Sequence, residues 1–265
     1  MQSLKEKISI IVPVYNEEDR IYTNLKEIKK TFDDFGCEYE IIICDDGSQD
    51  STLKEAARFG RDFRELPLVI THNRCNYGKG RALKKSFKYA TGGYVIWLDG
   101  DLDLHPFQIP TFFDIMRLTK TDIVIGSKRH PNSVLYYPLS RRIMSIIYFS
   151  LIKFLFNLPV NDTQTGLKLF KREALRDVFK RILVKKFAFD LEVLVIAHHL
   201  GYKIAEAPVF LNSQRGFGRI GIKPIFKMIW DTLAVWYRMY ILKYYDRINH
   251  HRRKGLLREF KRVRK

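Results

Sequence analysis

The sequence predicts an α/β protein with a mostly parallel central sheet flanked by helices, and three observations support this fold. Over the first 130 residues, apolar runs of strand length alternate with segments of helical periodicity, which is typical of parallel sheets. The runs are almost continuously apolar, as expected when helices cover both faces of a sheet. Each run ends in polar, turn-forming residues. Because such sheets bind ligands at the carboxyl ends of their strands, we expect a ligand site there.

The first strand is expected at residues 8–14, and the others follow in order at 39–44, 68–71, 94–98 and 123–125. A helix after the first strand is indicated by apolar residues in helical spacing: Ile21, Leu25, Ile28 and Phe32. Turn residues and a helix cap at 45–51 separate the second strand from the next helix. The loop at 73–80 precedes a helix that ends near residue 90.

Three carboxylates at alternate positions follow the fourth strand: Asp99, Asp101 and Asp103. Their hard oxygen atoms suit Mg²⁺ or Mn²⁺, and such a metal would hold the diphosphate of a nucleotide. The alternative is a solvated acidic turn, which is the better reading for an isolated Asp-x-Asp. Residues 78–80, Gly-Lys-Gly, stand at a helix start and could cradle phosphate, although glycine and lysine also form ordinary loops.

The chain is strongly basic, with 47 Lys and Arg against 29 Asp and Glu in 265 residues and a formal net charge of +18. This charge indicates a polyanionic partner, which could be nucleic acid, an anionic membrane or a phosphorylated substrate. Nucleic acid is disfavoured because the acidic strand end would repel phosphates, and the cations concentrate late in the chain without a recognised binding motif. The length permits one large domain with an appendage.

The three cysteines, Cys37, Cys44 and Cys75, lack metal-type spacing and are interpreted as reduced thiols of an intracellular protein. No signal peptide is expected at the amino terminus. The longest lipid-like run, residues 143–158, contains Lys153 and is shorter than the roughly 20 apolar residues of a spanning helix. Any membrane contact is therefore expected to be peripheral.

The C-terminal part is expected to form amphipathic helices from residue 222, in which aromatic residues alternate with cations. This mixture is typical of helices that lie in a membrane interface. Residues 251–265 carry eight basic residues and one acidic residue, a net charge of +7. Each cation near an anionic leaflet contributes roughly 1 kcal/mol, although a plain solvated tail is the alternative. We therefore divide the chain into a domain at 1–220 and a basic, membrane-associating helical tail at 221–265.

Four motifs carry a resemblance to a known family. Residues 12–17, 44–48, 76–80 and 98–101, in that order and spacing, resemble the nucleotide-sugar-binding half of the family 2 glycosyltransferases, which have the Rossmann-like GT-A fold. The resemblance covers roughly residues 8–130. Two later blocks, 160–172 and 189–193, resemble the dolichyl-phosphate glucosyltransferase branch more than the mannosyltransferase branch, and a mannosyl-transferring relative remains an alternative.

The resemblance implies a donor site and a metal site. The implied donor-binding residues are Pro13, Tyr15, Glu17, Asp45, Asp46, Lys79 and Asp99. Among these, the first three would line the nucleoside pocket, Asp45 or Asp46 would read the base, and Lys79 would lie near the nucleotide. The implied ligands of Mg²⁺ or Mn²⁺ are Asp99, Asp101 and Asp103. Polyprenyl-phosphate members of the family often have Gln in place of Asp103.

The resemblance also implies an acceptor site. Its phosphate-binding residues would be Arg129, Arg141, Ser145 and Arg215, since guanidinium groups bind phosphate oxygens bidentately and stay charged. Arg215 falls in a segment that is a flexible basic loop in that branch, and with Asp101 and Asp162 it completes the implied catalytic set. Asp162 would orient the acceptor, or act as base if the acceptor were a hydroxyl. A hydrophobic helix is expected at 140–156, which includes Arg141 and Ser145. It could instead be a helix of the protein core.

The expected function is inverting transfer of a hexose, glucose carried on uridine diphosphate, from a nucleotide diphosphate sugar to dolichyl or another polyprenyl phosphate. The enzyme would act peripherally at the cytoplasmic face of a membrane with an anionic surface. The nearest alternative is a family 2 glycosyltransferase with a hydroxyl acceptor on a polysaccharide, lipid or protein. A catalytically dead scaffold is disfavoured because the acidic motif is intact.

Overall fold

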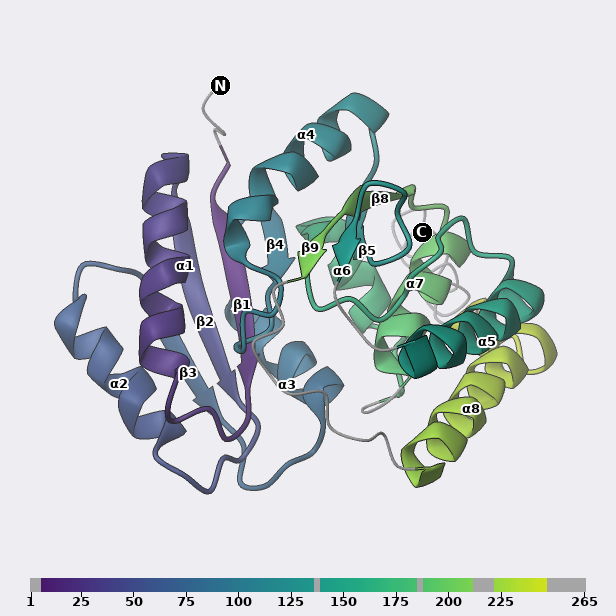
Figure 1. Ribbon diagram of the computed structural model, residues 1–265, viewed down its shortest axis with the longest axis horizontal. Helices are drawn as coiled ribbons and strands as arrows, with labels where there is room; N and C mark the ends of the chain where they lie inside the picture. The colour runs from purple at the N-terminus through teal and green to yellow at the C-terminus, as the bar shows by residue number, and fades with distance from the viewer. Residues whose placement is uncertain (1–5, 136–138, 185–187, 212–221, 247–265) are drawn as a thin grey trace, which may run out of the picture.

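The computed structural model describes residues 6–135, 139–184, 188–211 and 222–246. Side chains at 135, 139–144 and 222–225 lie outside this description. The chain forms a seven-stranded sheet in the order β3-β2-β1-β4-β7-β5-β8 (Figure 1). Its strands are β1 (Ile8–Val14), β2 (Tyr39–Asp45), β3 (Leu68–His72), β4 (Tyr94–Trp97), β5 (Ile123–Ser127), β7 (Lys168–Lys171) and β8 (Ile204–Pro208).

All neighbouring strands are parallel except at β7, which runs antiparallel to both β4 and β5. A separate two-stranded parallel sheet pairs β6 (Val134–Leu135) with β9 (Phe210–Leu211). The expected α/β fold with a mostly parallel sheet is confirmed, and each of the five expected strands is present. Strands β6 to β9 were not expected from the sequence.

Helices cover both faces of the sheet, as the continuous apolar strands predict. They are α1 (Ile21–Phe35), α2 (Thr52–Asp62), α3 (Lys79–Ser86), α4 (Ile109–Thr119), α5 (Leu139–Phe156), α6 (Arg172–Phe179), α7 (Phe189–His199) and α8 (Ile222–Trp236). Alternate β1 residues face opposite cores: Ile10 packs with the side chains of α1 and α4, and Ile11 packs with those of α3 and α7. Every helix among the described residues is too short or too polar to cross a bilayer.

The described part of the C-terminal segment packs on the core that contains Ile11 and the side chains of α3 and α7. Val235 of α8 and Tyr245 beyond it are fully buried there. Glu192 of α7, also fully buried, accepts hydrogen bonds from the Tyr245 hydroxyl (2.5 Å) and from Arg238 (3.3 Å). The division expected near residue 220 falls in the undescribed stretch 212–221 and stays a prediction.

We expect Glu192→Gln to lower the free energy of unfolding by about 3 kcal/mol, because it removes a fully buried charge that accepts hydrogen bonds from Arg238 and Tyr245. Chemical denaturation measures this value. The matched control is Glu55→Gln, which removes an exposed pair with Arg58 on α2 (3.3 Å) and should cost less than about 1 kcal/mol. Equal losses in the two variants would show that Glu192 does not anchor the C-terminal segment.

Candidate active site

The three carboxylates that follow β4 lie at the carboxyl end of the sheet, beside the end of β1. The amide of Gly100 donates to the Pro13 carbonyl (3.2 Å), which extends the β1–β4 pairing into the acidic loop. Only glycine fits at position 100, because a Cβ there would lie 2.6 Å from a methyl carbon of Val14. The chain then turns, with the Leu102 amide donating to the Asp99 carbonyl (3.1 Å) and Leu102 in a left-handed conformation. The acidic loop therefore lies at the carboxyl end of the sheet, as expected from the sequence.

Lys79 and Asp99, two of the expected donor-binding residues, form an ion pair with 2.5 Å between Nζ and Oδ1. Lys79 is the first residue of α3, and both side chains are about one-third exposed. Burial opposes ionisation of Lys79, but the carboxylates of Asp99 and Asp190 outweigh it and raise its pKa above the usual value. The ammonium group therefore stays charged at the mouth of the site, where a diphosphate would need it.

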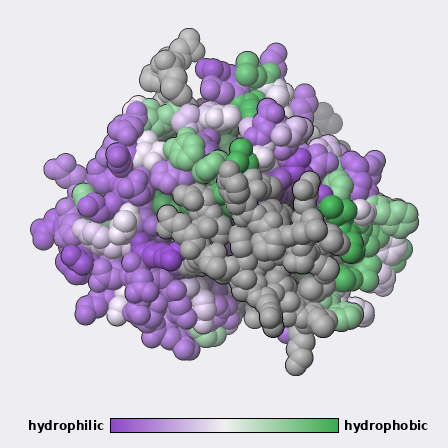
Figure 2. Space-filling model, in the orientation of Figure 1, coloured by the Kyte–Doolittle hydropathy of each residue, from purple (hydrophilic) through white to green (hydrophobic). Residues whose placement is uncertain are grey.

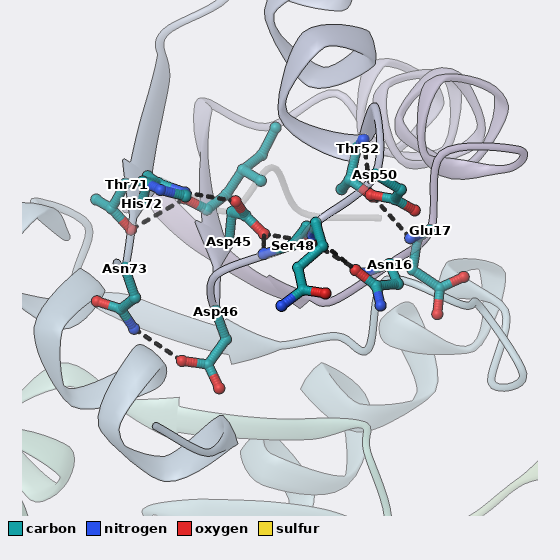
Figure 3. A network of polar contacts seen from close by, with 12 residues as sticks. Asn16, Glu17, Asp45, Asp46, Ser48, Asp50, Thr52, Thr71, His72 and Asn73 are labelled. Atoms are coloured by element: carbon teal, nitrogen blue, oxygen red, sulfur yellow. Dashed lines mark hydrogen bonds and ion pairs between the residues drawn. The ribbon is translucent and has the colours of Figure 1, made fainter. Parts of the chain in front are cut away.

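Asp45 and Asp46 are almost fully buried at the end of β2, where they bind the neighbouring loops (Figure 3). Asp45 accepts hydrogen bonds from the Ser48 amide (3.1 Å) and hydroxyl (2.5 Å) and contacts His72 Nδ1 (2.7 Å). Asp46 accepts from Asn73 Nδ2 (2.8 Å) and from the amides of Tyr77 (3.1 Å) and Gly78 (2.7 Å). These contacts shape the loop that leads to Lys79. A direct contact of either carboxylate with a base stays a prediction.

The loop after β1 holds the expected pocket residues Pro13, Tyr15 and Glu17. It is joined to the β2 loop: the Asn16 amide donates to Ser48 Oγ (2.9 Å) and the Glu17 amide donates to Thr52 Oγ1 (2.7 Å) (Figure 3). The ring of Tyr15 is 41% exposed beside this junction. The structure therefore places these residues on the same sheet end as Lys79 and Asp99, and their contact with a nucleoside stays a prediction.

The donor atoms of the acidic loop fit a hard divalent cation. Asp101 and Asp103 belong to one turn, in which the Asp103 amide donates to Asp101 Oδ1 (3.2 Å). Among the described residues, no three His, Cys, Asp or Glu side chains converge into a complete metal cage. Mg²⁺ is commonly held by one or two carboxylates together with water and substrate phosphates. The loop therefore fits a metal that is held jointly with a diphosphate.

Asp162 organises a loop that comes from the second half of the chain. Its Oδ2 accepts a hydrogen bond from the Lys128 amide (3.0 Å) and its Oδ1 accepts one from the Gln164 amide (3.0 Å). Glu206 of β8 in turn accepts from the amides of Asn161 (2.7 Å) and Asp162 (3.0 Å). Asp162 is thus fixed beside the residues that follow β5, which include Arg129.

Gly166 brings the loop of Asp162 against the acidic loop. A Cβ at position 166 would lie 2.1 Å from Asp99 Oδ2, so only glycine permits the approach seen here. The donor-side motif at 98–101 and the later block at 160–172, which are far apart in sequence, therefore lie against each other.

We expect Gly166→Ala to reduce kcat/KM for the donor by about a hundredfold, because it displaces a carboxylate that must be placed accurately. Steady-state kinetics and a thermal melt separate this loss from unfolding. The control is Gly60→Ala in α2. It adds a Cβ 2.8 Å from the flexible tip of the Leu68 side chain and should leave the kinetics unchanged. A Gly166→Ala enzyme with wild-type donor kinetics would contradict the assigned role of Asp99.

Arg129 and Ser145, both expected at the acceptor phosphate, are brought together. The Arg129 guanidinium donates to Ser145 Oγ (2.9 Å) and lies over the ring of Phe149, 4.7 Å from its centroid. Residue 141 lies on the same helix, α5, but the side chain of Arg141 is outside the described residues, as is all of Arg215. The described half of the expected acceptor set therefore forms a cluster next to the Asp162 loop.

Two charged residues of the site, one fully buried and one partly buried, were not expected. Lys168 of β7 is fully buried and pairs with Asp190 of α7, with 2.6 Å between Nζ and Oδ1. Burial lowers the pKa of Lys168, and the cations of Lys168 and Lys79 lower the pKa of Asp190 against the opposing effect of burial. Both residues stand in the blocks 160–172 and 189–193. The available signal was a lysine between two leucines in a short apolar run, because a buried lysine needs a charged partner.

Comparisons with known proteins agree with this arrangement. The model of glycosyl transferase family 2 matches residues 9–179. A dolichyl-phosphate beta-glucosyltransferase of Trichomonas vaginalis is 32% identical over 251 residues, which cover 91% of this chain and 76% of the relative. A dolichyl-phosphate beta-glucosyltransferase of Dictyostelium discoideum is 33% identical over 213 residues, covering 76% of this chain and 65% of the relative.

A solved structure shares the fold. Glucosyl-3-phosphoglycerate synthase from Mycobacterium tuberculosis, in complex with Mn²⁺, UDP-glucose and phosphoglyceric acid, superposes with a TM-score of 0.65 at 21% identity, over 88% of this chain and 79% of that one. This likeness supports the GT-A architecture. From the family match and the relatives, the chain belongs to glycosyl transferase family 2 and is a glycosyltransferase similar to the dolichyl-phosphate beta-glucosyltransferases.

Proposed function

We propose that this protein transfers glucose from UDP-glucose to dolichyl phosphate or another polyprenyl phosphate, with inversion at the anomeric carbon. The contact of Gly166 with Asp99 carries the proposal, because it joins the donor-side pair Lys79–Asp99 to the loop that holds Asp162 beside Arg129. The relatives are named for a dolichyl phosphate acceptor. The structural relative was solved with UDP-glucose and Mn²⁺.

The residues suggest a direct displacement. A phosphate oxygen of the acceptor attacks the anomeric carbon as the bond from that carbon to the donor's diphosphate breaks, so the new and broken bonds lie on opposite faces of the sugar. The acceptor is already an anion, and the attack needs no strong general base. Arg129 holds the acceptor phosphate by charge-assisted hydrogen bonds, and Lys79 stabilises the departing diphosphate. Bound Mg²⁺ or Mn²⁺ would neutralise charge on the diphosphate, with Asp99, Asp101 and Asp103 as its proposed ligands.

The test is transfer of radiolabel from a panel of nucleotide sugars to a short, soluble polyprenyl phosphate in the presence of Mg²⁺ or Mn²⁺. We expect label from UDP-glucose to move into the organic phase. The free polyprenol is the matched control acceptor, since it has a hydroxyl group in place of the phosphate. Transfer to the polyprenol and not to its phosphate would contradict the acceptor assignment, and transfer from GDP-mannose alone would contradict the donor assignment.

A membrane location is part of the proposal. Exposed apolar side chains gather on α5 and α8 and the turn after α8, and we name this surface the α5–α8 face: Ile146, Ile147, Phe154, Phe226, Trp230, Leu233, Tyr237, Tyr240 and Ile241. Figure 1 draws the two helices side by side, and Figure 2 shows apolar atoms on the same side of the molecule. Their contact includes a hydrogen bond between the hydroxyls of Tyr148 and Thr232 (3.0 Å). A patch of this kind fits a membrane interface.

Vesicles that contain anionic lipid test this location. The variant Phe154→Glu/Trp230→Glu places charges where the side chains are 87% and 73% exposed, so we expect it to lose cosedimentation with the vesicles while it keeps activity on the short acceptor. The control Leu118→Glu changes an equally exposed residue of α4 (77%) and should bind like the wild type. Unchanged binding of the double variant would contradict the α5–α8 face as the membrane contact. The expected cytoplasmic orientation and the role of the basic tail, 251–265, stay parts of the proposal.

A further inference from the structure

Lys168 and Asp190 form a charged pair inside the protein that nothing in the proposed chemistry yet uses. Lys168 is fully buried, and the antiparallel register of β7 with β4 places it opposite Trp97, two residues before Asp99. Its Nζ also donates to the Thr165 carbonyl and lies 5.9 Å from the centroid of the Trp97 ring. A buried ammonium group is costly unless its hydrogen bonds and its charge are satisfied. The free-energy cost of burying Lys168 therefore indicates that the pair has a role beyond the packing of the core.

Near each member of the pair, one residue packs against Asp99 or against the neighbour of Lys79. Thr165, the acceptor of the Lys168 hydrogen bond, precedes Gly166, whose backbone lies against the Asp99 carboxylate. Phe189 precedes Asp190, and its ring lies 2.2 Å from the position of a Cβ on Gly80, the neighbour of Lys79. The Gly166 backbone near Lys168 thus packs against Asp99, and the Phe189 ring beside Asp190 packs against the residue that follows Lys79.

Charge links the same four residues. Lys79 forms an ion pair with Asp99 and also interacts electrostatically with Asp190, while Lys168 forms an ion pair with Asp190. The four formal charges sum to zero when both lysines and both carboxylates are ionised. If Asp99 turns toward a donor or its metal, Lys79 loses its nearest counter-charge. Of the carboxylates that then still act on Lys79, Asp190 has a larger effect than Asp101.

We propose that Lys168 and Asp190 are positioning residues that hold Lys79 for the diphosphate of the donor and leave Asp99 able to part from it. The inference rests on the proposed function and extends it to the interior of the protein. It assigns to Asp190 the role of second partner of Lys79, and to Lys168 the role of keeping Asp190 ionised and fixed. Neither residue touches the donor, so each acts through Lys79 and Asp99.

The decisive variant is Lys168→Met/Asp190→Leu, which removes both charges together. Exchange of a buried ion pair for apolar residues of similar volume is often neutral for stability, whereas removal of one partner is strongly destabilising. We expect the double variant to melt close to the wild type and to bind UDP at least tenfold more weakly in direct titrations with and without Mg²⁺. The KM for the acceptor should stay unchanged. If the pair has only a structural role, a double variant as stable as the wild type should also bind UDP as tightly as the wild type.

Two further arms make the test specific. In the background of Lys79→Met, the double change should have no additional effect on UDP affinity, because it acts through Lys79; additive effects would overturn the proposal. The control Lys171→Met removes a pair with Asp122 (2.9 Å) at the other end of the same strand and should leave UDP affinity unchanged. If the double variant does not fold, Lys168→Gln/Asp190→Asn keeps the polar shape and takes its place in the same cycle.

The outcomes separate this inference from the proposed function. Equal affinity of the wild type and the double variant for UDP would overturn the positioning role and leave the glucosyltransferase proposal intact. A wild-type protein that binds neither UDP nor GDP would overturn both. Weaker binding of UDP only in the variants that lack the Lys168–Asp190 pair or Lys79 would support the inference.

Discussion

Asp101→Asn is expected to abolish sugar transfer, with kcat lowered about a thousandfold or more. Asp101 stands in the turn at the carboxyl end of β4, where carboxylates fit a cation held jointly with a diphosphate. The neutral amide removes the negative charge that such a cation requires, and loss of this stabilisation costs several kcal/mol in the transition state. Label transfer at saturating donor and acceptor measures the rate, and circular dichroism with a thermal melt shows that the fold is kept.

Two comparison variants sharpen this expectation. Asp114→Asn removes an exposed carboxylate of α4 that pairs with its neighbour Arg117 (3.0 Å), and it should not change the rate. Asp103→Gln introduces the residue that polyprenyl-phosphate members of the family often carry at this position, and it should keep activity within about tenfold. Metal-dependent turnover by Asp101→Asn at the wild-type rate would remove the basis for a metal site in this loop.

The first five strands could be predicted because each leaves a local signal in the sequence. Residues such as Ile10 and Ile11 face opposite cores, so the run around them is apolar throughout and cannot be mistaken for a surface segment. Strand β7 left no such signal. It has four residues, two of them lysines, and it is a strand because its neighbours β4 and β5 lie antiparallel to it. That pairing joins segments far apart in the chain and cannot be read from local pattern.

The site was predictable as a set of motifs but not as a set of contacts. The ion pair of Lys79 with Asp99 and the approach of Gly166 to Asp99 depend on the positions of three separate strands. The loop contacts made by the carboxylates of Asp45 and Asp46 could not be predicted either, and the contact of one of them with the base stays a prediction. The Lys168–Asp190 pair was missed because a charged residue in an apolar run shows that a partner exists, without showing which residue it is.

Variants of Arg129 and Asp162 distinguish a phosphate acceptor from a hydroxyl acceptor. If the nucleophile is a phosphate, Arg129→Ala removes a charge-assisted contact of about 1.5 to 3 kcal/mol, which should lower kcat/KM for polyprenyl phosphate roughly tenfold to a hundredfold. If it is a hydroxyl, Asp162 must accept its proton, and Arg129 matters little for the rate. Sequence reasoning assigns Arg141 and Arg215 to the same phosphate, so their alanine variants should behave like Arg129→Ala.

Asp162→Asn is expected to be damaging in either case, so its rate alone does not discriminate. Both oxygens of Asp162 accept backbone hydrogen bonds, and an amide can accept at only one of them, so the loop beside Arg129 would shift. The pH profile discriminates, because a phosphate monoester gains its second charge near pH 6. With a phosphate nucleophile, the rise in rate above about pH 6 should persist in Asp162→Asn at a lower level. Absence of any rise near pH 6 in the wild type, together with wild-type rates in Arg129→Ala and loss of activity in Asp162→Asn, would identify Asp162 as the base and a hydroxyl as the acceptor.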